Sequence, residues 1–300
     1  MLDLFKQEKM KKLFLLLPVV LVSLFWSAWK EPIQYRTAIS KDEVISCMNM
    51  ETIESYLQEA STQDFANMHP SVKKAIEEPL IGKMITFNTA DGHPGNGYFI
   101  PSKKKSKRWL IVIQEWWGLN ENIKHEADKY FKDLGDMNVL AVDMFDGKVA
   151  STPDSASKIM RSADMNRMTS IIKGAITHAG KDASIYTVGW CFGGMWSLQT
   201  AILAGSQAKG TIMFYGRPES NLEKLQSIQC DVIGFFGNLD RSPAPAVVTE
   251  FENNMKLAGK KLETHKYEAG HGFANPSNPS FNVNAAADSY SKAIAFLKSH

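Results

Sequence analysis

The chain has 300 residues, enough for one large α/β domain with an extension or for two small domains. Hydrophobic residues make up 44% of it and charged residues 22%, a balance that excludes global disorder. The formal net charge of +2 gives no reason to expect a nucleic-acid partner. The basic run at 103–108 is typical of a solvated turn, because no aromatic platform or binding motif accompanies it.

Four lysines between residues 6 and 12 precede an apolar stretch at 13–26. A positive region before a short apolar run predicts an export signal, and the run is shorter than the ~20 residues needed to span a bilayer. Cleavage after Ser27 or Ala28 fits this pattern, but Trp26 is large for a cut after Ala28. We therefore predict a periplasmic or secreted protein, with residues 1–28 as a cleaved signal peptide or an uncleaved membrane anchor.

The chain contains three cysteines, Cys47, Cys191 and Cys230, so at least one thiol is free even in an oxidising compartment. No Cys-x-x-Cys pair exists, so the sequence supports neither a thioredoxin-type redox pair nor a zinc knuckle. Cys230 either pairs with Cys47 or is a small core residue at the start of a strand. We prefer the core interpretation.

Residues 31–82 are predicted to form a helical extension, with helices beginning near 42–43 and at 61–66 and with no recognisable chemistry. Two strand-like segments, 84–87 and 97–100, flank a turn rich in glycine, proline and asparagine, which predicts a β-hairpin.

Apolar strands and amphipathic helices alternate in the rest of the chain. Further strands are expected at 109–113, 139–142, 185–188, 211–215, 232–236 and 264–267. Helices are expected at 122–134, 153–177, 195–204, 245–257 and 285–298. The alternation predicts one α/β domain over 84–300, with a mostly parallel sheet and helices on both of its faces.

Residues 189–194 read Gly-Trp-Cys-Phe-Gly-Gly between a β-branched run and a helical pattern. A Gly-x-Cys-x-Gly-Gly turn from strand to helix is typical of a nucleophile elbow, here with Cys191 in place of the usual serine. Gly189 and Gly193 lack the β-carbons that would crowd such a turn. The backbone N–H of Phe192 would form half of an oxyanion hole. Within this glycine frame, we prefer a nucleophile to a buried structural thiol.

A catalytic thiol needs a base, and the base needs an orienting group. His271 lies between two glycines in the loop after the strand at 264–267, whereas the other six histidines are interpreted as surface or packing residues. Asp240 follows the strand at 232–236, and the order 191, 240, 271 is that of α/β-hydrolases. Asp143 is the competing acid, but it precedes the nucleophile and is also interpreted as a loop or cap residue.

Glu115 follows the buried strand at 109–113 and precedes Trp116 and Trp117. Desolvation beside two large apolar rings should raise the pKa of this carboxyl group. A raised pKa suits a proton-handling role near the thiol.

Four motifs occur in order: Gln-Glu-Trp-Trp-Gly at 114–118, the Cys191 motif at 189–194, Gly-Asn-Leu-Asp at 237–240 and Gly-His-Gly-Phe at 270–273. Together they resemble the signature blocks of the dienelactone hydrolases, the carboxymethylenebutenolidases within the α/β-hydrolases. The resemblance covers about residues 84 to 298.

The resemblance implies a catalytic triad of Cys191, His271 and Asp240. It also implies that Glu115 holds the resting thiol protonated, takes its proton when substrate binds and releases it to His271. The second oxyanion donor would be the backbone N–H of Trp116.

Lactone-hydrolysing members of that family hold the substrate carboxylate with arginines. Arg161 is either the match to one of them or a solvated helix residue. Asn275 stands where the other would lie, and an amide cannot replace a bidentate cation. Trp117 completes the candidate substrate contacts.

We therefore expect a small-molecule hydrolase, acting on an activated ester or lactone through a thiol-ester acyl-enzyme. The alternatives are a thioesterase or broad carboxylesterase on the same fold, a non-catalytic binding or scaffold protein that keeps a degenerate elbow, and a redox-responsive thiol protein. No metal or organic cofactor is implied. We expect a monomer that contacts no nucleic acid, and a membrane only through an uncleaved N-terminal anchor.

Overall fold

The computed structural model describes residues 51–70 and 78–300. These residues belong to one compact unit that runs from Asn49 to His300. The predicted signal at 1–28, Cys47 and the helix expected near 42–43 lie outside the described residues. Within the described ranges, no helix has both the length and the apolar character that crossing a bilayer requires.

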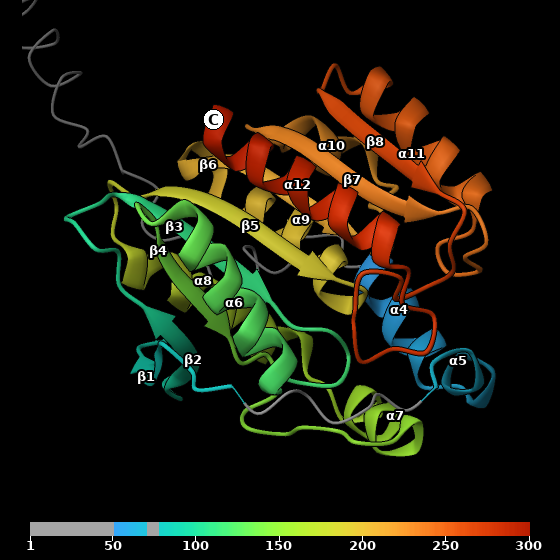
Figure 1. Cartoon of the computed structure of the whole chain (residues 1–300), viewed down its shortest axis with the longest axis horizontal. Helices are drawn as coiled ribbons and strands as arrows, with labels where there is room; N and C mark the ends of the chain where they lie inside the picture. Colours follow the sequence, from blue (N-terminus) through green and yellow to red (C-terminus); the bar gives the residue numbers. More distant parts are fainter. Residues whose placement is uncertain (1–50, 71–77) are drawn as a thin grey trace, which may run out of the picture. The chain divides into compact units, whose positions relative to one another are not determined.

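One eight-stranded sheet forms the centre of the unit (Figure 1). Its strands are β1 (Lys83–Phe87), β2 (Gly95–Ile100), β3 (Arg108–Ile113), β4 (Asn138–Val142), β5 (Ser184–Trp190), β6 (Ala208–Phe214), β7 (Asp231–Gly237) and β8 (Leu262–Tyr267). Their order is β1-β2-β4-β3-β5-β6-β7-β8. The strand β2 is antiparallel to both of its neighbours, and all other pairs are parallel. The predicted hairpin and mostly parallel sheet are confirmed.

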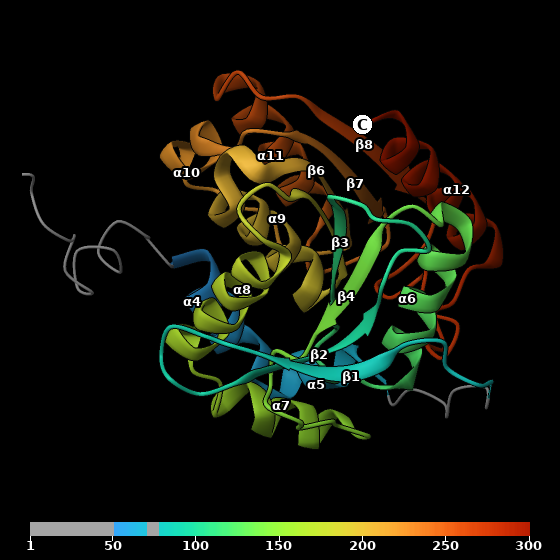
Figure 2. The same cartoon turned by 90° about the vertical axis from the view of Figure 1, so that its left-hand side faces the viewer.

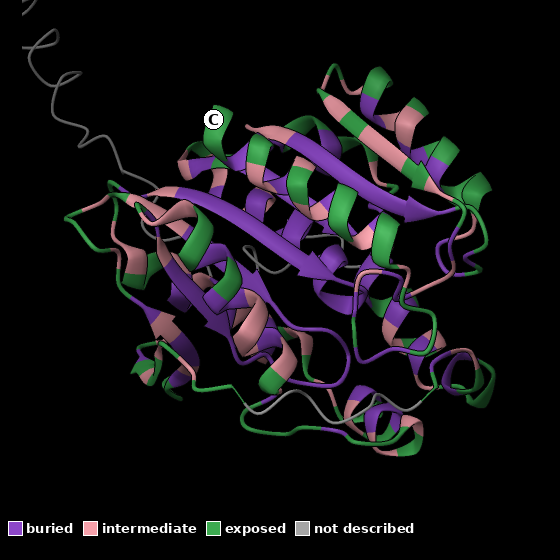
Figure 3. Ribbon diagram, in the orientation of Figure 1, coloured by how far each residue is buried: buried purple, intermediate pink, exposed green. Residues whose placement is uncertain are grey.

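Helices cover both faces of this sheet (Figure 2). The main ones are α6 (Glu121–Leu134) and α12 (Val283–Ser299) on one face, and α8 (Met165–Ala179), α9 (Phe192–Ala204), α10 (Leu222–Ser227) and α11 (Pro245–Leu257) on the other. Strand β3 shows why both faces are covered. Leu110 and Val112 pack on the α6 side, whereas Ile111 and Ile113 pack on the α8 and α9 side. Continuous apolar strands of this kind need cover on each face, as the buried central strands in Figure 3 show.

The prediction of a single helix at 153–177 is wrong. The chain forms α7 (Pro153–Arg161) and then α8, because the Asp164 side chain caps a new helix by accepting from the N–H groups of Asn166 and Arg167. The short helix α10 was also not predicted. It begins after Asn221, whose side chain accepts from the N–H of Lys224.

Parallel pairing brings the carboxyl ends of β3, β5, β7 and β8 to one edge of the sheet. Two helices that precede the sheet in sequence, α4 (Glu51–Ala60) and α5 (Gln63–Met68), lie at this edge near the end of β5 (Figure 1). The loops that carry the predicted chemistry are therefore covered by the N-terminal segment of the described chain.

Candidate active site

The turn between β5 and α9 has the geometry that its glycines predict. Cys191 adopts φ 55° and ψ −118°, a conformation that costs free energy in a non-glycine residue. A β-carbon on Gly189 would lie 2.0 Å from the carbonyl oxygen of Gly193. A β-carbon on Gly193 would lie 2.2 Å from the carbonyl oxygen of Ile113. The close approach of these backbones holds the strained turn and presses it against the end of β3.

His271 and Asp240 meet at the adjacent strand ends. His271 Nδ1 lies 2.8 Å from Asp240 Oδ2, and Asp240 Oδ1 accepts from the N–H of Ser242 at 2.9 Å. A carboxylate can only accept, so Nδ1 carries a hydrogen, and Nε2 is the nitrogen left to exchange a proton with the thiol. Burial lowers the pKa of His271, but the charges of Cys191 and Asp240 raise it more, and the net pKa lies well above its usual value. This pair has the geometry of a base and its orienting acid.

The Cys191 thiol is buried, and its hydrogen-bond partner comes from α4. The Tyr56 hydroxyl lies 3.4 Å from Cys191 Sγ. Burial, with a further contribution from Cys191, raises the pKa of Tyr56 well above its usual value. Because the phenol therefore stays protonated, its O–H can donate to the sulfur. Sequence reasoning assigned no chemistry to this segment, so the contact corrects that interpretation.

His69 also lies at the site, although the sequence grouped it with surface or packing histidines. Its ring stacks on Phe65 at 3.9 Å and lies edge-on to His271 at 4.6 Å. Its Nδ1 lies 2.7 Å from the carbonyl oxygen of Phe65. Burial and the nearby His271 charge lower the pKa of His69 to about 3. His69 is thus neutral, and its Nδ1–H donates to that carbonyl.

Helix α4 is held in place by the loops that follow β6 and β7. Thr52 Oγ1 donates to the buried Glu219 at 2.6 Å, and Glu59 forms an ion pair with Arg217. Ser242 Oγ donates to Glu59 Oε1 at 2.9 Å. Since the N–H of Ser242 also binds Asp240, α4 is connected to the loop that positions the acid.

Glu115 is buried, but its hydrogen bonds differ from the expectation. Its Oε2 accepts from Asn275 Nδ2 at 2.7 Å, and its Oε1 accepts from the Tyr215 hydroxyl at 3.3 Å. Burial raises the pKa of Glu115, and these two hydrogen bonds offset the effect only in part. The raised pKa expected from the sequence is present. The thiol, however, is bonded to Tyr56 rather than to Glu115.

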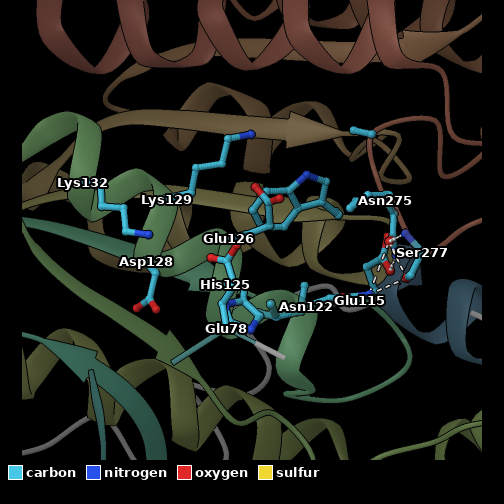
Figure 4. Close-up of a pocket in the computed structure, with 14 residues that line it drawn as sticks. Glu78, Glu115, Asn122, His125, Glu126, Asp128, Lys129, Lys132, Asn275 and Ser277 are labelled. Carbon is cyan, nitrogen blue, oxygen red and sulfur yellow. Dashed lines mark hydrogen bonds between the residues drawn. The ribbon is translucent and has the colours of Figure 1, made fainter. Parts of the chain in front are cut away.

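Asn275 occupies the position at which the resemblance calls for an arginine. Its Nδ2 binds Glu115, and its Oδ1 accepts from the N–H and the Oγ of Ser277. Asn275 and Glu115 line a cavity of about 400 Å³ between α6 and the loop after β8 (Figure 4). Neither Cys191 nor His271 lines this cavity. Asn275 therefore positions Glu115.

The other two candidate substrate contacts have partners within the protein. Arg161 Nη1 donates to the carbonyl oxygen of Ser61 at 2.9 Å, so the guanidinium holds the turn between α4 and α5 rather than a substrate carboxylate. Trp117 is buried with its ring against Trp116 at 4.8 Å, in the core rather than in a described cavity.

The competing acid Asp143 caps a turn. Its two oxygens accept from the N–H groups of Phe145 at 3.1 Å and Gly147 at 2.6 Å. This is the loop-residue alternative that the sequence left open, and Asp240 is the acid that faces His271. Cys230 is a half-buried free thiol whose pKa burial raises to about 12, in agreement with a packing role.

A second cavity, of about 290 Å³, reaches the histidine. His69, Asp240, Ser242 and His271 are among its lining residues. It connects His69 and His271 with the protein surface.

Comparison with known proteins agrees with this architecture. The model of the dienelactone hydrolase family matches residues 96–300. The chain belongs to the dienelactone hydrolase family. It is therefore an α/β-hydrolase-fold enzyme that hydrolyses carboxylic esters. Tyr56 and His69 lie outside the matched residues.

The chain aligns with individual relatives over most of their length. "Protein usf" of Aquifex pyrophilus is 26% identical in an alignment of 235 positions that covers 73% of this chain and 99% of that protein. A "Putative carboxymethylenebutenolidase" of Saccharolobus solfataricus is 28% identical in an alignment of 240 positions that covers 67% of this chain and 92% of that protein. The solved structure of a "putative dienelactone hydrolase" from Klebsiella pneumoniae has a TM-score of 0.66 at 18% identity. It covers 74% of this chain and 100% of that one, and shows the same fold.

Proposed function

We propose that this family member hydrolyses small activated esters or lactones, with Cys191 as nucleophile, His271 as base and Asp240 as orienting acid. The observation that carries the proposal is the strained Cys191 turn beside a histidine whose Nδ1 lies 2.8 Å from Asp240. The strain and the hydrogen bond both prepare side chains for nucleophilic attack.

In acylation, His271 Nε2 accepts the thiol proton and Cys191 Sγ attacks the carbonyl carbon. The tetrahedral intermediate collapses to a thiol ester, and the alkoxide leaves with the proton from His271. In deacylation, His271 takes a proton from water while the water oxygen attacks the thiol ester. Collapse then releases the acid and returns the proton to Cys191. Asp240 stabilises the imidazolium in both halves.

The backbone N–H groups of Phe192 and Trp116 would stabilise the oxyanion. Phe192 is the first residue of α9, where backbone N–H groups lack partners within the helix. Trp116 follows the end of β3, and that strand end touches the elbow through Gly193. Two donors from these turns would face the same carbonyl oxygen.

Glu115 would act as a proton reservoir beside this machinery. Burial raises its pKa, so it exchanges protons closer to neutral pH than an ordinary glutamate does. Its hydrogen bonds to Asn275 and Tyr215 hold it at the end of β3, where the carboxylate oxygens bind these two side chains rather than the thiol.

The substrate would be uncharged at its acyl part. Arg161 is engaged with Ser61, and the neutral Asn275 is engaged with Glu115, so neither supplies a cation to a substrate carboxylate. This favours a neutral activated ester or lactone over an anionic dienelactone.

A substrate panel tests the proposal. The purified protein and Cys191→Ala would be assayed with an aryl acetate, a small lactone, an anionic lactone and an acyl thioester. We expect the highest kcat/KM for the neutral ester or lactone, and none for Cys191→Ala with an unchanged circular dichroism spectrum. Turnover by Cys191→Ala would refute the mechanism. A preference for the thioester would favour a thioesterase, and a preference for the anionic lactone would refute the substrate assignment.

We also propose that the N-terminal segment exports the enzyme. The four lysines and the apolar run at 13–26 support this. Cell fractionation of the full chain and of a form lacking residues 1–28 should show export of the first alone. Equal distribution would contradict the proposal.

A further inference from the structure

Three side chains from distant parts of the sequence converge at the nucleophile. One ring nitrogen of His69, one of His271 and Cys191 Sγ all lie within 4.8 Å of one another. His271 and Cys191 belong to the proposed triad. His69 comes from the segment after α5 and has no part in that mechanism.

The two histidines resemble each other in how their ring nitrogens are bonded. Nδ1 is engaged in each ring, with the Phe65 carbonyl in His69 and with Asp240 in His271. Nε2 is buried in each ring and has no hydrogen-bond partner among the described residues. A buried nitrogen without a partner costs free energy unless something binds it.

This is how proteins prepare histidines to bind metals. A metal-ligating histidine typically donates its other N–H to a carboxylate or a backbone carbonyl, which fixes the tautomer and directs the lone pair at the metal. His271 has the carboxylate partner and His69 has the carbonyl partner. Both rings are therefore oriented before any ion binds.

We propose that His69, Cys191 and His271 form a zinc-binding site, and that a bound Zn²⁺ reversibly blocks the nucleophile. Thiolate and imidazole ligands select Zn²⁺ over Mg²⁺ or Ca²⁺, which prefer oxygen. Three protein ligands leave the fourth tetrahedral position for water.

The geometry requires only a small closure. With a Zn–N distance of about 2.0 Å and a Zn–S distance of about 2.3 Å, ligand atoms around tetrahedral zinc are about 3.5 Å apart. The three atoms are within 4.8 Å here, so movements of about 1 Å suffice. A cavity lined by His69 and His271 leads from the surface to two of the three ligands.

Binding would displace one proton to solvent, from the thiol or from the imidazolium, and would involve no redox step. The Cys191 sulfur and the His271 lone pair would both be occupied. Zinc would thus inhibit the enzyme. The inhibition rests on the proposed function, whereas the binding does not.

Cobalt binding tests the site directly, because Co²⁺ replaces Zn²⁺ with visible absorption bands. The full chain would carry Cys47→Ser and Cys230→Ser, which leaves Cys191 as its one thiol. We expect one Co²⁺ per chain, with bands typical of tetrahedral coordination and a thiolate-to-metal band in the near ultraviolet. Zn²⁺ should abolish these bands. Their absence from this protein would overturn the proposal.

Two variants of the protein that carries Cys47→Ser and Cys230→Ser test whether His69 is a ligand. His69→Phe keeps an aromatic ring against Phe65 and removes both nitrogens. It should weaken Co²⁺ binding at least about tenfold. His178→Phe is the matched control, because His178 packs against Trp109 at the other end of β3, and it should bind as tightly as the parent. Equal affinity of the two variants would overturn the role of His69.

A further measurement uses the protein with both histidines intact, so it tests the proposal even if His69→Phe does not fold. Zn²⁺ should slow alkylation of Cys191 by iodoacetamide at least about tenfold, and a chelator should restore the rate. Unchanged alkylation would overturn the proposal. Loss of ester turnover on every substrate, with cobalt binding intact, would refute the proposed function and leave the site standing.

Discussion

Two regions of the molecule meet at Cys191, and they are held by different forces. The loops at the ends of β3, β5, β7 and β8 are fixed largely by their backbones. There, Cys191 is strained and glycines allow backbones to approach within contact distance. The segment 51–70 is held mainly by side chains, through the bonds of Thr52 to Glu219 and of Ser242 to Glu59, and through burial of Tyr56.

The two regions therefore have different roles. The strand-end loops hold the proposed catalytic residues, and the segment 51–70, called the cover from here on, lies over them. The strand-end loops lie within residues 96–300, which match the family model, whereas Tyr56 and His69 do not. The loops should therefore carry the reaction common to the family. The covering segment should adjust access to the thiol and its reactivity in this chain. If so, changes in the loops will be far more damaging than changes in the cover.

The largest effect should come from the base. His271→Ala leaves the thiol without a proton acceptor, so kcat/KM for an activated ester should fall at least about 10³-fold. Steady-state kinetics on the variant and on His178→Phe, which should retain activity, would measure this. Less than a tenfold loss would mean that the loops do not carry the chemistry.

The orienting acid comes next. Asp240→Asn removes the charge that stabilises the His271 imidazolium, and kcat should fall by about 10²- to 10⁴-fold. The control is Asp143→Asn, which weakens a turn cap. It should lower the unfolding temperature and leave kcat nearly unchanged. If the two variants lost activity equally, the choice between the two acids would have to be reversed.

Glu115→Gln should change the pH dependence of thiol reactivity. Removing a buried negative charge favours the thiolate, so the midpoint of Cys191 alkylation by iodoacetamide should move to lower pH. Because its pKa is raised in the folded state, Glu115 favours folding most below its ordinary titration range. That contribution is lost as the pH rises through the raised pKa. An unchanged alkylation profile would remove Glu115 from the proton path.

The smallest effect should come from the cover. Tyr56→Phe removes one hydrogen bond to the thiol, so kcat/KM should change only a few-fold and the free energy of unfolding by about 1 kcal/mol. Tyr290→Phe, which loses its bond to Asp133 on α6, is the matched control. A loss as large as that of His271→Ala would mean that Tyr56 belongs to the catalytic machinery and would break the separation between the regions.

The sequence allowed the strand-end chemistry to be predicted because local constraints mark it. Cys191 and His271 lie between glycines, and Asp240 follows an apolar strand, so each could be found without knowing the fold. The parallel sheet was predictable for a similar reason, since apolar periodicity is a local signal. The split at Asp164 was missed because one capping side chain interrupted an otherwise helical pattern.

The contacts between the segment 51–70 and the active site could not be predicted in the same way. Ile53, Tyr56 and Ala60 are buried on one face of α4 and have helical spacing, which indicates only that this face packs on something. Nothing near Tyr56 or His69 in sequence shows that they lie against residues more than a hundred positions away. Likewise, the partner of Arg161 is a backbone carbonyl that has no sequence signature.

Trapping the acyl-enzyme tests the central claim most directly. The full chain would be mixed with a slowly hydrolysed aryl ester and quenched in acid, and its peptides would be mapped by mass spectrometry. We expect the acyl group on Cys191 alone, formed and lost at rates that account for turnover. Turnover with no adduct on Cys191, or with the acyl group on another residue, would contradict the account.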